Sequence, residues 1–405
     1  MNYDRFINQR VKDLPKSGIR RFFDIASELD DCISLGVGEP DFVTPWEIRD
    51  AAIKSVQAGR TQYTSNAGLL SLREEIALYL NGRFSLSYDP GEEIIVTIGA
   101  SEAIDLAMRT VVSAGDEVLI PSPCYVSYAP AVLLSGGIPV AVNARAEDGF
   151  KLTPSLIEGA VTPRTKAIIM AYPNNPTGAI MTKEELLKIV PSFVKHDLVV
   201  VSDEIYAELT YTKERHCSIA SLPDMRERTI VVNGFSKAFA MTGWRLGYVA
   251  APKELVSQMY KIHQYTIMCA ATCSQAGGEA ALRLGRQDGY SSVEDMRASY
   301  DVRRRYLTAE FDRMGLTCFK PQGAFYVFPS VKSTGMTGDE FAEKLLYSKH
   351  VAVVPGSAFG ESGKYFVRCS YATKLSALKE AVARIGEFLK ESHDKPPSAK
   401  ELTKL

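Results

Sequence analysis

TIVVNGFSKAFAMTGWRLGYVAAP, residues 229–252, is the segment from which the architecture of this chain is inferred most directly. It opens with a run rich in β-branched residues, 229–234, and closes with a second apolar run, 245–252. Between them a single lysine, Lys237, stands among Gly, Ser and Ala. Runs rich in Val and Ile predict strands, so this lysine follows the end of a strand. A solvent-exposed lysine is the ordinary interpretation, and the rest of the chain argues against it.

Similar apolar runs recur through the first part of the chain. Together with the two above, they are residues 93–99, 116–123, 138–143, 166–172, 198–203, 229–234 and 245–252. They are nearly continuous rather than alternating, which is typical of strands buried on both faces of a parallel sheet. Segments with helical periodicity lie between them. One, 101–115, is expected to end with Gly115 as its C-cap, and another, 182–197, opens with Thr182 and Glu185 in capping-box spacing.

The fold class predicted is α/β, with a large domain that contains a mostly parallel seven-stranded sheet flanked by helices. From about residue 290 the pattern changes to a long amphipathic helix, 293–315. Short strands around 321–330 and 365–372 follow, with a helix at 337–349 between them, which predicts a smaller α+β domain. The predicted division is 46–288 for the large domain, 1–45 plus 289–390 for the N-terminal arm and small domain, and 391–405 for a flexible tail.

Composition and charge exclude several classes of function. The 405 residues are 46% hydrophobic and 23% charged, as expected for a globular chain of two domains. A formal net charge of −1 gives no basic field for nucleic acid or an anionic membrane. No apolar run reaches roughly 18 residues and the charged N-terminus lacks a signal segment, so a cytoplasmic protein is expected. The seven cysteines lack metal-ligand spacing, and no metal is expected.

Several chemically useful residues follow the carboxyl ends of the predicted strands, where open α/β sheets bind ligands. They are Gly99, Ala100, Ser101, Tyr125, Asn175, Asp203, Tyr206, Ser236 and Lys237, with Arg245 nearby. Taken singly, each has an ordinary structural explanation: a Gly-Ala-Ser helix start is more often a plain cap, and a strand-end Asp is more often an N-cap. Together they suit a flat, phosphorylated, nitrogen-heterocyclic aldehyde.

The phosphate and the ring face of such a ligand have their predicted partners here. A phosphate dianion binds backbone N–H groups at a helix N-terminus, which the start at 99–101 offers. The hydroxyl of Ser236 and the guanidinium of Arg245 complete the phosphate site. The ring face stacks on the aromatic side chain of Tyr125.

The other groups of the ligand predict the remaining roles. A ring nitrogen that must stay protonated needs a carboxylate, which Asp203 supplies. A ring phenolate needs donors, and Asn175 and Tyr206 provide them. The aldehyde needs a primary amine with an accessible neutral form, which only a lysine supplies. Lys237 is therefore expected to form a Schiff base, and its small neighbours allow the ligand to approach the backbone.

Motifs along nearly the whole chain, in order and spacing, carry a family resemblance. They are SLGVGEPDFVTP (34–45), YTSNAGLLSLREEIA (63–77), GASEA (99–103), PNNPTGAI (173–180), SDEIYAEL (202–209), GFSKAFAMTGWRLGY (234–248), PQGAFYVF (321–328) and VRCSYA (367–372). The sequence resembles the fold-type I pyridoxal-phosphate enzymes, and within them the class I/II aminotransferases related to aspartate, aromatic and alanine aminotransferases. As a set these motifs are highly specific.

The resemblance implies that pyridoxal 5'-phosphate is the cofactor and that Lys237, Asp203 and Tyr206 are catalytic. It implies that Arg368 binds the substrate α-carboxylate, helped by Asn175 and the backbone of Gly38. The reaction implied is a ping-pong transfer of the amino group of an L-amino acid to a 2-oxo acid, with 2-oxoglutarate as the expected acceptor.

The resemblance also bears on assembly and on the substrate. Tyr63 matches a tyrosine that reaches the phosphate of the neighbouring subunit, which implies a homodimer with composite sites. Some aspartate-preferring relatives carry lysine at the position of Ser101, so its absence weakens an acidic-substrate interpretation without excluding it. The preferred amino acid stays open among aspartate, alanine, aromatic, branched-chain and acylated diamino acids.

Two alternatives compete with amino transfer. The same motifs serve other pyridoxal-phosphate chemistry, such as β-elimination from a cysteine conjugate, and do not distinguish it. A non-catalytic regulator on this scaffold is disfavoured, because the 33 residues before Ser34 are too few for a DNA-binding module and the charge is wrong. Histidines 196, 216, 263, 350 and 393 show no motif spacing with a carboxylate or cysteine, so surface or core roles are expected for them.

Overall fold

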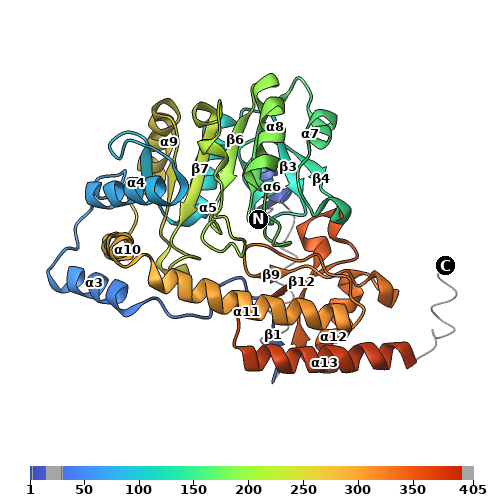
Figure 1. The fold of residues 1–405 in the computed structure, drawn as a ribbon. Coiled ribbons are helices and arrows are strands. Elements are labelled where there is room, and N and C mark those ends of the chain that lie inside the picture. Colours follow the sequence, from blue (N-terminus) through green and yellow to red (C-terminus); the bar gives the residue numbers. More distant parts are fainter. Residues whose placement is uncertain (2, 15–28, 30, 395–405) are drawn as a thin grey trace.

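The computed structural model describes residues 1, 3–14, 29 and 31–394, which form two unequal parts (Figure 1). The larger part contains the main sheet, and helices α11 (Ser291–Arg313) and α13 (Leu375–Asp394) run along the smaller part. Of the predicted tail 391–405, residues 391–394 continue α13 and the remainder lies outside the described residues. Within the part of the chain that the structure describes, no helix is long and apolar enough to cross a membrane.

The larger part is built on a seven-stranded sheet with the strand order β2-β8-β7-β6-β5-β3-β4. Its strands are β2 Ile94–Thr97, β3 Glu117–Ser122, β4 Ile138–Asn143, β5 Thr165–Ala171, β6 Val199–Asp203, β7 Thr229–Gly234 and β8 Gly247–Ala250. Strands β3 to β7 pair in parallel, whereas β8 is antiparallel to both of its neighbours. Each strand coincides with one of the predicted runs to within a few residues, so the predicted fold class is confirmed.

Both faces of this sheet are buried, as the continuous apolar runs predicted. Along β3, Val118 and Ile120 pack into a cluster with helices α5 (Gly99–Val111), α6 (Tyr128–Leu134) and α9 (Lys253–Thr266). Leu119 packs into another cluster with α7 (Pro154–Ala160) and α8 (Lys183–Lys195). Successive side chains of a strand point to opposite faces, so one apolar run supplies both clusters. The sheet is therefore enclosed between two helical layers, and its strand ends remain the accessible edges.

The helices connect the strands and cover the sheet. They are α1 Gln9–Lys12, α3 Trp46–Gln57, α4 Leu70–Phe84, α5 Gly99–Val111, α6 Tyr128–Leu134, α7 Pro154–Ala160, α8 Lys183–Lys195, α9 Lys253–Thr266, α10 Thr272–Asp288, α11 Ser291–Arg313, α12 Gly338–Lys349 and α13 Leu375–Asp394. The predicted capping box of α8 is present, since Thr182 and Glu185 each accept a hydrogen bond from the other's backbone N–H. The predicted Gly115 cap is wrong: α5 ends at Val111 because Val112 is extended, and Gly115 (φ 89°) lies in the turn before β3.

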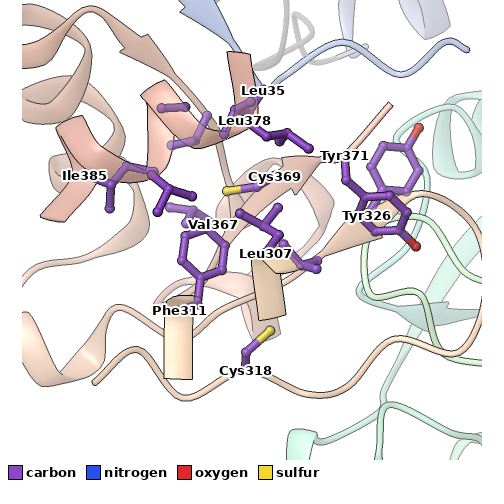
Figure 2. Close-up of a cluster of buried hydrophobic side chains, with 14 of the residues drawn as sticks. Leu35, Leu307, Phe311, Cys318, Tyr326, Val367, Cys369, Tyr371, Leu378 and Ile385 are labelled. Atoms are coloured by element: carbon purple, nitrogen blue, oxygen red, sulfur yellow. The ribbon is translucent and has the colours of Figure 1, made fainter. Parts of the chain in front are cut away.

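The smaller part has short strands around an aromatic and aliphatic core. Its strands are β1 Ile33–Ser34, β9 Tyr326–Val327, β10 Val351–Ala352, β11 Val354–Pro355 and β12 Val367–Ser370. Strand β12 pairs antiparallel with β9 and β11, and β1 pairs in parallel with β10. Figure 2 shows the core they enclose, including Leu307, Phe311 and Leu378 from the helices. The β1–β10 pair joins the N-terminal segment to the C-terminal one, which supports the predicted division; the division itself stays a prediction.

Candidate active site

A cavity of about 500 Å³ opens at the carboxyl ends of β5, β6 and β7, where the smaller part of the chain meets the sheet. Its lining includes these predicted site residues: Gly38, Ala100, Ser101, Tyr125, Asn175, Asp203, Tyr206, Ser236, Lys237, Arg245 and Arg368. It also includes residues that were not predicted: Glu39, Ile104, Val126, Tyr128, Ala171, Pro173, Ile205, Thr242 and Tyr326. A cavity of this volume holds a small organic ligand with a substrate beside it.

Lys237 follows the end of β7 and points into this cavity. Its Nζ donates a hydrogen bond to the carbonyl of Gly38 at 2.6 Å and lies 5.8 Å from the ring centre of Tyr206. Burial lowers the pKa of Lys237 to about 8, although the nearby carboxylate of Glu39 opposes the shift. A lowered pKa makes the neutral, nucleophilic amine accessible near neutral pH.

Asp203 is the last residue of β6, and its carboxylate is almost fully buried. The hydroxyl of Tyr128 donates to Oδ2 at 2.8 Å, and the backbone N–H of Ile205 donates to Oδ1 at 3.1 Å. Burial raises the pKa of Asp203 to about 6, while the Tyr128 hydrogen bond acts in the opposite direction. Each oxygen thus has one donor and keeps a lone pair for a cationic ligand group facing the cavity.

The N-terminus of α5 and Arg245 form an anion-binding corner of the cavity. Gly99 has φ 74°, and a Cβ there would lie 2.4 Å from Nη2 of Arg245, so only glycine allows this approach. Ala100, Ser101 and Ser236 line the cavity beside them. Free N–H groups at a helix start together with a guanidinium suit a phosphate group.

A buried histidine, His263, supports this anion-binding corner through Glu102. Glu102, in the first turn of α5, accepts a hydrogen bond from the backbone N–H of Ile98 at 2.5 Å. His263 has no exposed surface; its Nδ1 lies 2.6 Å from Glu102 and its Nε2 lies 2.8 Å from the carbonyl of Asn66. His263 therefore stabilises the start of α5, which is a core role of the predicted kind.

Arg368 reaches the cavity from β12 and is nearly fully buried. Its Nη1 donates to Oδ1 of Asn175 at 2.9 Å, and its Nη2 donates to the carbonyl of Gly36 at 2.5 Å. Its Nε is buried without a hydrogen-bond partner among the described residues. The guanidinium lies 4.4 Å from the ring centre of Tyr326 and 4.9 Å from that of Phe359. A rigid cation with an unsatisfied donor suits a carboxylate ligand.

Two predicted residues do not line the cavity. Gly99 lies behind it, against Arg245. Tyr63 lies outside the cavity of its own chain, with 79% of its surface exposed. Its predicted role involves a second subunit and stays a prediction.

Two tyrosines of the site were missed in the sequence. Tyr128 follows Tyr125 by three residues, and only the position of α6 against β6 brings its hydroxyl to Asp203. Tyr326 lies in a motif quoted for the resemblance alone; its hydroxyl is 2.9 Å from that of Tyr206. Tyr128 could have been noticed as a second phenol beside the same strand end, whereas nothing local in the sequence signals the contact of Tyr326.

Among the described residues, no group of three or more His, Cys, Asp or Glu side chains is arranged to hold a metal ion. The seven cysteines are free thiols. Cys124 is the one that neighbours the cavity residue Tyr125, and burial raises its pKa to about 12. A thiol with a raised pKa is a poor nucleophile, so Cys124 contributes packing here.

Comparison with known proteins identifies the family. The sequence pattern described as aminotransferase class I and II matches residues 30–385. YugH of Bacillus subtilis (strain 168), named as an aminotransferase without a stated substrate, is 53% identical over 384 residues, covering 95% of this chain and 98% of that protein. An aspartate aminotransferase of Pyrococcus abyssi is 46% identical over 385 residues, covering 95% and 98%. The solved aromatic aminotransferase of Pyrococcus horikoshii OT3 is 47% identical, covers 91% and 99%, and superposes with a TM-score of 0.87.

The chain belongs to the class I and II aminotransferases, the family that its motifs resemble. It is an enzyme that transfers an amino group, and its relatives are aspartate and aromatic aminotransferases of the fold-type I pyridoxal-phosphate family. This excludes the non-catalytic alternative.

Proposed function

We propose that this enzyme uses pyridoxal 5'-phosphate to move the amino group of an L-amino acid to a 2-oxo acid, with 2-oxoglutarate as the acceptor. One observation carries the proposal: a half-buried lysine, a buried aspartate, an anion-binding helix start and a buried arginine line the same cavity. They are Lys237, Asp203, the start of α5 and Arg368.

The residues present fit each group of this cofactor. The start of α5, with Ser236 and Arg245, would hold the phosphate, and the ring of Tyr125 would stack on the pyridine face. Asp203 would hold the protonated ring nitrogen, because it keeps a free lone pair in a buried position. Tyr206 and Asn175 would donate to the ring oxygen.

Lys237 has two tasks in this scheme. Its amine would hold the cofactor through the cofactor's aldehyde, and its pKa of about 8 keeps a fraction of the amine neutral near neutral pH. With the substrate bound, the same Nζ would take the proton from the substrate α-carbon and would then deliver it to the cofactor carbon rather than back to the substrate. When bound, the cofactor supplies an electron-withdrawing ring that lowers the barrier to that proton removal.

Arg368 fixes the orientation of the substrate in this proposal. The remaining donors of its Nη1 and Nη2 would bind the α-carboxylate, while Tyr326 and Phe359 pack against the guanidinium. The carboxylate then directs the α-carbon towards Lys237. The backbone of Gly38, which accepts the Nζ hydrogen bond, lies on the same side of the cavity.

A half-reaction screen tests the proposal and identifies the donor. The purified enzyme is loaded with pyridoxal phosphate, mixed with single amino acids, and followed by the loss of cofactor absorbance as pyridoxamine phosphate forms. Full restoration by 2-oxoglutarate supports the proposed acceptor. Release of pyruvate and ammonia from a cysteine conjugate without any oxo acid would instead support β-elimination.

We also propose a cytoplasmic homodimer with composite sites. Exposed apolar side chains, among them Trp46, Leu70 and Tyr265, support the presence of a partner surface. Tyr63 of each subunit would then contact the phosphate of the other. Sedimentation of the holoenzyme should give twice the chain mass, and Tyr63→Phe should weaken cofactor affinity without changing that mass.

A further inference from the structure

We propose that Tyr326 is a positioning residue of this site: its hydroxyl donates to Tyr206 and so directs the Tyr206 proton towards the cofactor's ring oxygen. The inference rests on the proposed function and adds a residue to it. The observation behind it is a pair of buried hydroxyls 2.9 Å apart, one on the loop after β6 and one on β9.

Tyr326 is held rigidly enough for such a role. It is 1% exposed, and it belongs to β9, where it pairs with Ser370 of β12. Its ring packs against Phe325 and under the guanidinium of Arg368. Figure 2 shows Tyr326 at the edge of the core cluster, with its hydroxyl directed away from the aliphatic side chains.

The number of protons on the two phenols shows why the direction of this hydrogen bond matters. Each phenol has one proton to donate. Among the described residues, the Tyr206 hydroxyl is the hydrogen-bond partner recorded for the Tyr326 hydroxyl. If Tyr326 donates, the Tyr206 proton is free for the ring oxygen; if Tyr206 donates, the ring oxygen loses that donor.

Relative acidity favours donation by Tyr326. Burial raises the pKa of both phenols, and the charge of Arg368 opposes that rise in both. The Arg368 guanidinium, however, lies against the Tyr326 ring itself, 4.4 Å from its centre, which makes the Tyr326 hydroxyl the more acidic of the two. The more acidic of two hydroxyls is the better donor, so Tyr326 donates and Tyr206 accepts. The Tyr206 hydroxyl thereby becomes a stronger donor to its own acceptor, since hydrogen bonds in a chain polarise one another.

The consequence is measurable on the bound cofactor. A donor at the ring oxygen stabilises its anionic form and so keeps the pKa of the lysine-linked cofactor low. Tyr326→Phe keeps the ring over Arg368 and removes only the hydroxyl. We expect the pKa of the bound cofactor, titrated by absorbance, to rise by a few tenths of a unit, because a neighbouring donor strengthens the Tyr206 hydrogen bond by about 10–30%.

Tyr371→Phe is the matched control. Tyr371 is buried in the same core, and its hydroxyl donates to the carbonyl of Ala324 at 3.1 Å rather than towards the cavity. This variant loses a buried phenolic hydrogen bond of the same kind. The cofactor pKa of Tyr371→Phe should equal that of the wild type.

Two double variants make the test specific. In a Tyr206→Phe background, Tyr326→Phe should change the cofactor pKa no further, because the relay is already broken. Gly38→Ala offers a steric route, since its Cβ would lie 2.8 Å from the Tyr326 hydroxyl oxygen and displace it. As a single substitution, Gly38→Ala should raise the pKa of the bound cofactor; added to Tyr326→Phe, it should raise that pKa no further. The single variant remains informative if Tyr326→Phe folds poorly.

The outcomes separate this inference from the proposed function. An unchanged pKa in Tyr326→Phe, or an equal further rise in the Tyr206→Phe background, overturns the role of Tyr326 while the enzyme still transfers amino groups. A wild-type protein that stays colourless with pyridoxal phosphate overturns both. A rise confined to backgrounds with an intact Tyr206 hydroxyl supports the relay.

Discussion

Asp203 and Glu204 are neighbours in the chain and both are buried, yet their carboxylates lie in two different environments. Asp203 faces the cavity, with one hydrogen-bond donor for each oxygen. Glu204 accepts from the hydroxyls of Ser202 at 2.9 Å and Ser218 at 2.7 Å, and its Oε2 lies 3.1 Å from Nε2 of His216. Since successive side chains alternate, the two acids serve opposite sides of one strand end.

The difference shows how burial of an acid is used. On the Glu204 side, protein groups surround the carboxylate, so its interactions contribute to the fold. On the Asp203 side, a cavity takes the place of some of these protein groups, and the carboxylate stays available to a ligand. Burial raises the pKa of Asp203 to about 6. Variants on the cavity side should therefore lose turnover, and variants on the Glu204 side should lose stability.

The largest effect is expected for Lys237→Ala, which removes the group opposite Asp203 in the cavity. Turnover should fall by about 10⁴-fold or more, because covalent attachment and proton transfer are both lost. The protein should fold and still retain pyridoxal phosphate without a covalent bond. Absorbance of the dialysed protein would show the retained cofactor, and borohydride reduction should leave the chain mass unchanged. Turnover equal to that of the wild type would disprove the role.

Asp203→Asn should have the next largest effect on rate. Leaving a buried cation unmatched costs about 3–5 kcal/mol, which corresponds to roughly a thousandfold loss of turnover. Steady-state kinetics at saturating cofactor measures this. A loss below tenfold would mean that Asp203 does not face the reacting ring.

The same variant should gain stability without cofactor. Because the pKa of Asp203 is raised from 3.8 to about 6, the folded state favours the protonated form. This contribution is fully present below about pH 4 and is lost as pH rises through about 6, a change of about 3 kcal/mol. The cofactor-free Asp203→Asn protein should match the wild type near pH 4 in thermal unfolding and exceed it above pH 6.

Glu204→Gln should show the reverse pattern. The amide cannot reproduce every contact of the carboxylate, so unfolding free energy should fall by about 1–3 kcal/mol. Turnover of the folded fraction should fall less than about tenfold, which equals 1.4 kcal/mol of barrier. Denaturant unfolding gives the free energy of unfolding, and kinetics on the same preparation gives the turnover rate. A loss of rate as large as in Asp203→Asn would contradict the different roles assigned to the two acids.

Tyr128→Phe should have a smaller effect on rate than Lys237→Ala or Asp203→Asn. The Tyr128 hydroxyl lowers the pKa of Asp203 against the larger effect of burial, so its removal should raise that pKa further above 6. Turnover should fall about tenfold, as expected for one hydrogen bond to a charged group. The acid side of the pH–rate profile should move to higher pH, and an unmoved profile would show that Tyr128 acts only in packing.

The residues predicted from sequence share a local signal. Lys237, Asp203 and Asn175 each lie at the end of an apolar run or within three residues of it, so strand recognition alone placed them at one edge of the sheet. The seven strands were predictable for the same reason, since a continuous Val- and Ile-rich run needs no partner to be recognised.

The features that were missed depend on contacts between distant segments. Tyr128 and Asp203 are 75 positions apart, and His263 and Glu102 are 161 apart. Strand β9 has only two residues, too few for any periodicity to place Tyr326. Such pairs arise from packing of α6, α9 and the small sheet against the larger one.

Arg368 reaches the cavity from β12, whereas Lys237 reaches it from the end of β7, so a reactant held by both ties the two parts of the chain together. Unfolding either part then forfeits the ligand's contacts with the other. In calorimetry, separate melting transitions of the two parts should merge into one when an amino-acid ligand is present. A reactant bound in this way would stabilise both parts of the enzyme against unfolding for as long as it stays bound.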